Sequence, residues 1–235
     1  MNIDFDIDIG SLDIEFDIPM FDNGFKNRYI KSKISNDLPN HKIKYSNALK
    51  LAKDIRFEKL SRYDCIVAGN FIFGDFIEAF ITHNNAKCKK LTISTLSLDQ
   101  NNVDSLANLI NSNFVDEFNL IISDYFYAHE KRSLVPYLYE KLDIDNKFQL
   151  AAAGTHTKIV LIETLGGKKI VIHGSANLRS SSNIEQFTIE ENDELYDFHL
   201  EYHEKIIEKY STINKDINKH KSLRGKALYD LIQKL

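Results

Sequence analysis

Short apolar stretches typical of β-strands alternate with amphipathic stretches typical of helices between residues 46 and 210. This alternation predicts an α/β fold, because helices that follow strands can cover the faces of one sheet. No internal repeat or low-complexity linker interrupts the region. The predicted strands are 65–73, 89–98, 117–123, 148–154, 156–163, 168–174 and 187–191. The predicted helices are 46–55 with Ser46 as N-cap, 74–84, 101–113, 129–142 (against which Pro136 argues mildly) and 194–210.

The two ends of the chain depart from this pattern. Residues 1–18 alternate acidic with apolar residues, as an edge strand or a docking tail would. Residues 19–45 contain two prolines and little periodicity, which predicts an irregular stretch. The residues from Ser211 onward are rich in lysine. We therefore divide the chain into an extended acidic N-terminal arm (1–45), an α/β domain (46–210) and a basic C-terminal tail or helix (211–235).

Charge and composition indicate which partners and which cellular compartment are expected for the protein. The chain has 235 residues and a formal net charge of −4, but residues 1–24 contain no Lys or Arg. The remaining body is therefore net basic and could meet a phosphate backbone. No apolar run approaches the roughly 20 residues that a membrane helix needs. We expect a cytoplasmic protein with no membrane partner, in which Cys65 and Cys88 are buried free thiols.

Polar residues cluster around two predicted strands near the middle of the chain. On the strand 156–163, His156 and Lys158 share one face, and strand parity places Glu163 on the other. A Gly-Gly turn leads into the strand 168–174, after which Ser175 and Asn177 follow two residues apart. A hairpin would bring His156, Lys158, Ser175 and Asn177 to one end of a sheet.

This set of side chains has a chemical logic. An imidazole can attack phosphorus and form a covalent intermediate. A lysine ammonium and an asparagine amide can hold the phosphate oxygens as negative charge builds on them. A carboxylate on the second ring nitrogen would fix the tautomer of the imidazole. Glu163 is the poorer candidate for that role because of its strand parity, whereas Glu185 lies beyond Asn177 and is free to return to the site.

The segments HTKIVLIE and GSANL resemble the H-x-K-x4-D and G-S-x-N motif of the phospholipase D superfamily. The resemblance implies that His156 is the nucleophile and that Lys158 and Asn177 bind phosphate. Gly174 and Ser175 match the Gly-Ser of the motif, which implies that both bind substrate. In SSSNIE, Glu185 takes the place of the glutamate that bonds the catalytic histidine. The sequence departs from the family in two ways: Glu163 replaces the motif aspartate, and the turn before GSAN is longer.

The resemblance also implies a fold and an activity. The fold would be a phospholipase D-like α/β sandwich with a mixed central sheet flanked by helices. The chain has one copy of the motif, and single-motif members pair as two-fold homodimers with a shared site. The implied activity is metal-independent phosphodiester hydrolysis through a phosphohistidine, without a cofactor. We expect a nuclease of a phage or mobile element, with DNA favoured over RNA. The alternative is a catalytically inactive nucleic-acid-binding, structural or regulatory protein.

Three further features have competing interpretations. The segment 123–132 combines aromatic residues with His129, Lys131 and Arg132, which would suit base stacking and phosphate binding or ordinary packing at a helix start. His173 falls outside the motif and is expected to pack or to support the site indirectly. His199 and His203 have the i, i+4 spacing of zinc ligands, but Leu200 replaces the glutamate that a zincin needs, so we expect no metal there.

Overall fold

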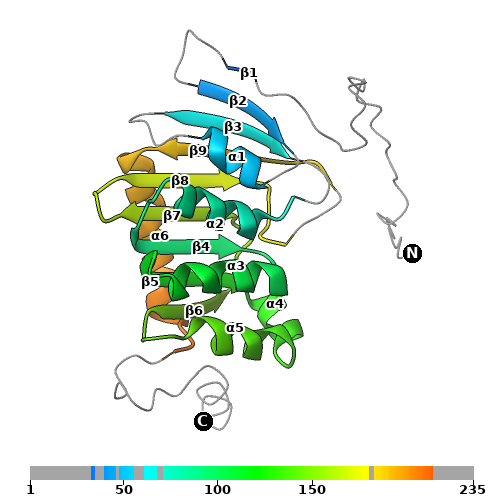
Figure 1. Ribbon diagram of the computed structural model, residues 1–235. Helices are drawn as coiled ribbons and strands as arrows, with labels where there is room; N and C mark the ends of the chain where they lie inside the picture. The colour runs from blue at the N-terminus through cyan, green and yellow to red at the C-terminus, as the bar shows by residue number, and fades with distance from the viewer. Residues whose placement is uncertain are drawn as a thin grey trace, which may run out of the picture.

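The computed structural model describes residues 48–55, 61–67, 71–179 and 183–213, together with the backbone of two short strands that precede them. Within these residues nine strands form one mixed sheet in the order β1-β2-β3-β9-β8-β7-β4-β5-β6 (Figure 1). The strands are β1 (Lys33–Ile34), β2 (Asn40–Tyr45), β3 (Arg62–Val67), β4 (Cys88–Thr95), β5 (Val115–Ser123), β6 (Phe148–Ala153), β7 (Ile159–Thr164), β8 (Lys169–Gly174) and β9 (Glu185–Glu191). The helices are α1 (Ala48–Asp54), α2 (Phe73–His83), α3 (Gln100–Asn111), α4 (Asp124–Glu130), α5 (Leu134–Leu142) and α6 (Asp193–Tyr210).

Helices cover both faces of the sheet. In Figure 1, α1, α2, α3 and α5 lie in front of it and α6 crosses behind β5 to β8. The front layer buries the main apolar cluster, to which α2 contributes Phe76, Ile77 and Phe80. The rear layer is smaller and packs Tyr196 of α6 against Leu161 of β7. Because both faces are covered, β4 and β5 are buried along most of their length, as expected of central strands.

The predicted α/β architecture, a mixed sheet flanked by helices, is confirmed. The strand predicted at 65–73 instead runs from Arg62 to Val67, and the helix α2 begins at Phe73. Ser46, the predicted N-cap of the first helix, lies outside the described residues, as do the acidic segment 1–18 and the basic segment 214–235.

The helix predicted at 129–142 is two helices. Ser123 caps α4 by accepting a hydrogen bond from the backbone N–H of Phe126 at 3.0 Å, so this helix starts before the predicted segment. The chain then turns at 131–133 and restarts as α5. Pro136 lies in the first turn of α5, where a helix has no acceptor for the backbone N–H that proline lacks.

Part of the segment predicted to be irregular forms strands. β2 pairs in parallel with β3 and antiparallel with β1, so residues 40–45 extend the sheet at one edge. The sequence of β2, NHKIKY, alternates in polarity, and the neighbouring β3 supplies partners for its backbone. The α/β sheet therefore begins before residue 46.

Both cysteines are buried free thiols, as predicted. Burial raises the pKa of Cys88 to about 12 and also raises the pKa of Cys65, so both thiols stay protonated at neutral pH. None of the helices in the described ranges is long and apolar enough to cross a membrane.

The strand directions gather many chain ends at one edge of the sheet, the right-hand edge in Figure 1. β4, β5 and β6 run parallel to one another, and β7 runs antiparallel to β4. β8 runs antiparallel to both β7 and β9. The carboxyl ends of β4, β5, β6 and β8 therefore meet the amino ends of β7 and β9. We call this edge the site edge.

Candidate active site

The segment Gly154–Lys158 crosses the site edge on its way from β6 to β7. At its start, Gly154 lies against Asp124 at the end of β5, since a Cβ on Gly154 would be 3.8 Å from Asp124 Oδ2. Farther along, Ser94 of β4 donates a hydrogen bond from Oγ to the backbone oxygen of Thr157 at 3.1 Å. The hydroxyls of Ser94 and Thr157 also contact each other, and Thr157 Oγ1 lies 2.9 Å from Thr155 Oγ1. These bonds fix the backbone on either side of His156.

His156 and Lys158 are directly hydrogen-bonded. Lys158 Nζ lies 3.1 Å from Nδ1 of the exposed His156 ring and 2.9 Å from the His156 backbone oxygen. An ammonium only donates, so Nδ1 is the acceptor and the neutral ring carries its proton on Nε2. Burial lowers the pKa of Lys158, and the nearby Glu185 carboxylate partly opposes that effect. The pair thus combines a basic ring and a half-buried cation that could bind phosphate.

Ser175 and Glu185 face each other at the same edge. The Ser175 hydroxyl donates a hydrogen bond to Glu185 Oε2, and it accepts one from the backbone N–H of Gln186 at 3.1 Å. The Ser175 backbone N–H donates to Gln186 O at 2.8 Å. The structure therefore places the Glu185 carboxylate on Ser175, close enough to Lys158 to affect its pKa, while the His156 ring is bonded by Lys158.

Asn177 is anchored to the end of β4. Its Oδ1 accepts a hydrogen bond from the backbone N–H of Leu96 at 3.3 Å, which leaves the Nδ2 group as the one suited to donate to a phosphate. The next residue donates its backbone N–H to Thr95 Oγ1 at 3.2 Å. Asn177 and the His156 segment are thus attached to the same end of β4, at Leu96 and Ser94 respectively.

Gly174 has a packing role. It pairs with Phe187 in the β8–β9 ladder. A Cβ at this position would lie 2.2 Å from Gln186 O and 2.6 Å from Phe187 Cα, which is impossible without movement of β9. The absence of a side chain therefore lets β9 approach and brings Glu185 next to Ser175.

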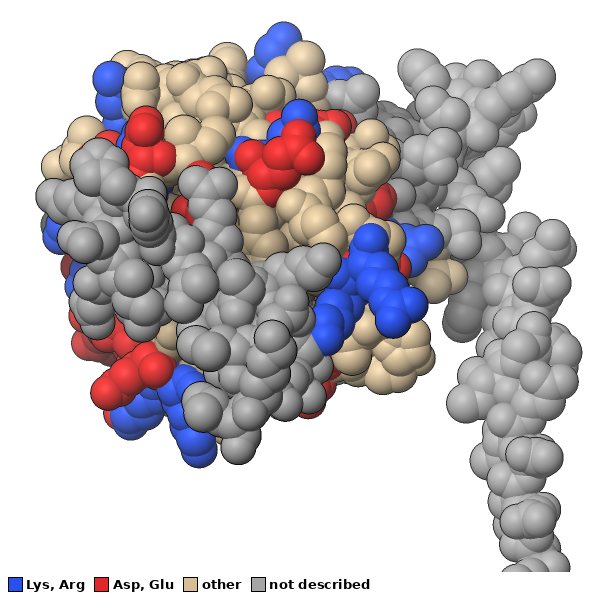
Figure 2. Space-filling view, turned by 90° about the horizontal axis from the view of Figure 1, so that it is seen from below, with Lys and Arg blue, Asp and Glu red and all other residues tan. Residues whose placement is uncertain are grey.

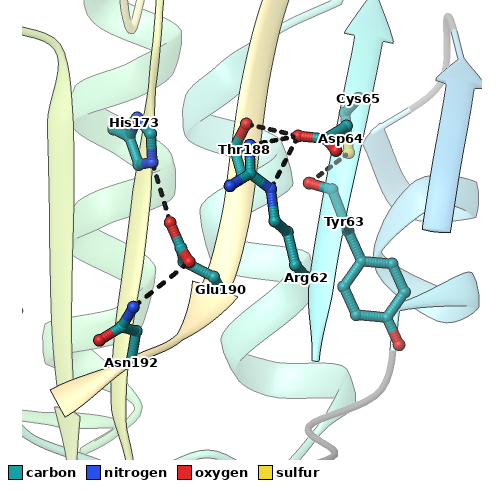
Figure 3. Close-up of polar contacts among 8 residues, drawn as sticks. All are labelled: Arg62, Tyr63, Asp64, Cys65, His173, Thr188, Glu190 and Asn192. Atoms are coloured by element: carbon teal, nitrogen blue, oxygen red, sulfur yellow. Dashed lines mark hydrogen bonds and ion pairs between the residues drawn. The ribbon is translucent and has the colours of Figure 1, made fainter. Parts of the chain in front are cut away.

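Two other polar residues of β7 and β8 form contacts away from the His156–Lys158 pair. Glu163 forms an ion pair with Lys89 at 2.7 Å, and it lies seven residues beyond His156, roughly 20 Å along an extended chain. His173 points to Glu190 on β9, with 3.2 Å between Nε2 and Oε1 (Figure 3). Neither contact involves the His156–Lys158 pair.

The predicted substrate-binding residues His129, Lys131 and Arg132 follow β5 through α4. The His129 ring lies against the Tyr125 ring in a tilted arrangement with 3.9 Å between ring centroids, and Arg132 is exposed in the turn after the helix. The start of α4 lies close to Gly154, whereas Lys131 and Arg132 lie about 10 Å farther along the helix axis. Seen from the β6 side, the visible Lys and Arg side chains form separate groups with acidic residues between them (Figure 2).

The two histidines of α6 contact each other, and His199 is half-buried whereas His203 is buried. His203 is fully buried, its Nδ1 lies 2.6 Å from His199 O, and burial lowers its pKa to about 4. Among the described residues no group of three or more His, Cys, Asp or Glu side chains is arranged to hold a metal ion.

Sequence reasoning missed the residues that hold the site in place. Thr157 lies between His156 and Lys158 in sequence and points to the opposite face of the strand, so it is not part of the motif. Ser94 and Leu96 lie in a different predicted strand, and the sequence carries no signal that β4 lies next to β7.

Comparison with known proteins gives matches at the level of structure. No protein-family model matches the chain, and no curated protein matches it by sequence. NucT from Helicobacter pylori matches with 17% identity and a TM-score of 0.49 over 64% of this chain and 98% of that one. Nuc from Salmonella typhimurium, a phospholipase D family member, matches with 15% identity and a TM-score of 0.47 over 64% and 97%.

A third match carries the fold assignment. Phosphatidylserine synthase from Haemophilus influenzae Rd KW20, a phospholipase D superfamily member, matches with 14% identity and a TM-score of 0.50. The match covers 77% of this chain and 46% of the synthase. The described part of the chain therefore shares the α/β fold of the matching part of this synthase.

Proposed function

We propose that the protein is a metal-independent phosphodiesterase that hydrolyses nucleic acid, with DNA favoured over RNA, and that two chains share one active site. The observation that carries this proposal is the His156–Lys158 pair at the site edge. A potential nucleophile and a cation form this pair, and the anchored amide of Asn177 and the Ser175–Glu185 pair lie at the same edge. Lys158 and Asn177 supply the positive charge and the hydrogen-bond donor that a phosphoryl transition state requires.

The proposed reaction begins with attack by Nε2 of His156 on phosphorus. The N–P bond forms as the P–O bond to the leaving group breaks, and a second imidazole gives its proton to the leaving oxygen. That imidazole then takes a proton from water, whose oxygen attacks phosphorus and breaks the N–P bond. The motif provides one histidine per chain, so the second imidazole would be His156 of another copy, in a symmetric homodimer.

Substrate binding has a defined task in this scheme. In the free protein Lys158 occupies Nδ1, so the neutral ring has its proton on Nε2 and that nitrogen cannot attack. A phosphate dianion or diester would draw the Lys158 ammonium away from Nδ1. The ring proton could then move from Nε2 to Nδ1, and the resulting Nδ1–H group would donate a hydrogen bond to the Glu185 carboxylate. Nε2 would then carry a free lone pair and become the nucleophile.

The test is cleavage of labelled oligonucleotides by the wild type, His156→Ala and Lys158→Ala in buffer with EDTA. Full wild-type cleavage in EDTA and a loss of at least about 100-fold in both variants are expected. Cleavage that stops on chelation, or that persists in His156→Ala, contradicts the mechanism. Light scattering at micromolar concentration should show a dimer, and a strict monomer removes the shared site.

A second candidate function is phosphate binding without catalysis. The observation that favours it is the same hydrogen bond, which in the free protein keeps the His156 ring in the non-nucleophilic tautomer. In that case the wild type would bind oligonucleotides in the assay above without cleaving them. Cleavage that depends on His156 excludes this candidate.

A further inference from the structure

An unusually exposed aromatic side chain lies at the site edge. Tyr125, in the first turn of α4, has 69% of its surface exposed. The next two residues are also aromatic, but Phe126 and Tyr127 are buried in the main core. Packing accounts for those two rings and gives no reason for the exposure of Tyr125.

Tyr125 follows a strand that ends near the start of β7. Its neighbour Asp124 lies close to Gly154, since Asp124 Oδ2 would be 3.8 Å from a Cβ built there, and Ser94 is hydrogen-bonded to the same segment at Thr157. In the sequence His156 lies between Gly154 and Thr157. β5, which leads into Tyr125, and β7, which follows Lys158, are separated by β4 alone, so their ends are about 10 Å apart.

The Tyr125 ring is supported by a second ring. The His129 ring lies 3.9 Å from it, with an interplanar angle of 37°. His129 Nδ1 lies 2.8 Å from the Tyr125 backbone oxygen, which only accepts, so Nδ1 donates and the ring is fixed in place. A ring that is held before binding loses less conformational entropy when a ligand stacks on it. Arg132 adds an exposed cation beyond this pair.

We propose that Tyr125, supported by His129, stacks on an unpaired base next to the phosphate held at Lys158, so that the substrate is single-stranded nucleic acid. The inference rests on the proposed function and specifies its substrate. Every base has an aromatic face, so stacking holds single strands with little sequence preference. Bases inside a duplex already stack on one another and leave no face for Tyr125.

Binding can be measured separately from cleavage. In a His156→Ala background, the anisotropy of a labelled single-stranded oligonucleotide reports affinity without turnover. We expect Tyr125→Ala to weaken binding about tenfold and Tyr125→Phe to bind within about twofold of the parent. Phe198→Ala is the matched control, because Phe198 is 67% exposed on α6, behind the sheet, and should leave affinity unchanged.

Two further ligands show whether the base is responsible. With an oligonucleotide of abasic sites, and with the duplex of the same sequence, Tyr125→Ala and its parent should bind equally. Equal affinity of the two proteins for the normal single strand overturns the proposal. So does an equal loss on the abasic strand, which would mean that Tyr125 contacts the backbone or supports the fold.

Hydrolysis of bis(p-nitrophenyl) phosphate, which has no base, tests the catalytic proposal alone. If Tyr125-dependent binding occurs without hydrolysis of any diester, stacking stands and catalysis fails. If the diester is hydrolysed with dependence on His156 but Tyr125→Ala binds normally, catalysis stands and stacking fails.

Discussion

Nζ of Lys158 lies 3.1 Å from Nδ1 of His156, so the residue predicted to bind phosphate is hydrogen-bonded to the predicted nucleophile. The contact keeps the Lys158 ammonium beside the His156 ring. It also occupies Nδ1, the nitrogen through which a carboxylate would otherwise orient the ring. Glu185 acts on this pair through charge, because it raises the pKa of Lys158 against the lowering effect of burial. Glu185 also accepts a hydrogen bond from the Ser175 hydroxyl.

The first prediction concerns the alkaline limit of substrate binding. Lys158 must be protonated to hold phosphate, so binding is lost as pH rises through its lowered pKa. Glu185→Gln removes the carboxylate that raises this pKa, and the alkaline limb should therefore move to lower pH. Glu163→Gln is the control, because Glu163 pairs with Lys89 at the other edge. Oligonucleotide affinity measured from pH 7 to 11 gives the comparison, and coincident limbs in the wild type and Glu185→Gln would exclude this coupling.

The second prediction tests the hydroxyls that hold the crossing segment. The side chain of Thr157 contacts Ser94 and Thr155, and neither of these contacts involves the His156 ring, the proposed reacting group. Thr157→Val keeps the shape of the side chain but removes the hydroxyl, so His156 should be held less accurately. We expect kcat to fall about tenfold or more with KM nearly unchanged. Thr157→Ser should restore most of kcat. A fall of the same size in Thr157→Ser would assign the effect to the methyl group instead.

The third prediction concerns the packing role of Gly174. Gly174→Ala should destabilise the fold by about 1–3 kcal/mol, because the added Cβ overlaps Gln186 O and Phe187 Cα. Gly166→Ala is the control, since its Cβ would meet Thr164 Oγ1 at an ordinary 3.8 Å. Urea unfolding of the two variants measures the difference. Equal midpoints would mean that β9 moves aside without cost.

The fourth prediction is an acid-dependent loss of stability that originates at His203. Burial lowers the pKa of His203 to about 4, whereas an unfolded histidine has a pKa of about 6.5. Between these values the unfolded chain binds a proton that the folded chain excludes. The contribution is therefore complete above pH 6.5 and is lost as pH falls toward 4, by about 3 kcal/mol in total.

The variant His203→Gln keeps a polar side chain of similar size but does not titrate. Its free energy of unfolding should change less between pH 7 and pH 4 than that of the wild type. His129→Gln is the control, because His129 is exposed. Parallel stability curves for the wild type and His203→Gln would refute the assignment.

The pattern of apolar residues was enough to predict the α/β class, the positions of most elements and the hairpin that joins β7 to β8. Periodicity determines these features because each element must bury one face or both. The register of that hairpin places Ile159 opposite His173, so His156, Lys158 and Ser175 reach one edge as predicted. Boundaries were less accurate where a cap decided them, as at Ser123 before α4.

The local sequence determined which side chains could take part in phosphoryl chemistry, because residue type and strand parity are properties of the chain itself. The tertiary structure decided how they are held. Lys158 bonds the His156 ring, Glu185 bonds Ser175, and Asn177 is anchored to Leu96. These contacts depend on the order β9-β8-β7-β4-β5, which places segments far apart in sequence side by side. Strand order comes from long-range packing, and for that reason the sequence alone could not reveal the contact between Ser94 and Thr157 or the exposure of Tyr125 next to the amino end of β7.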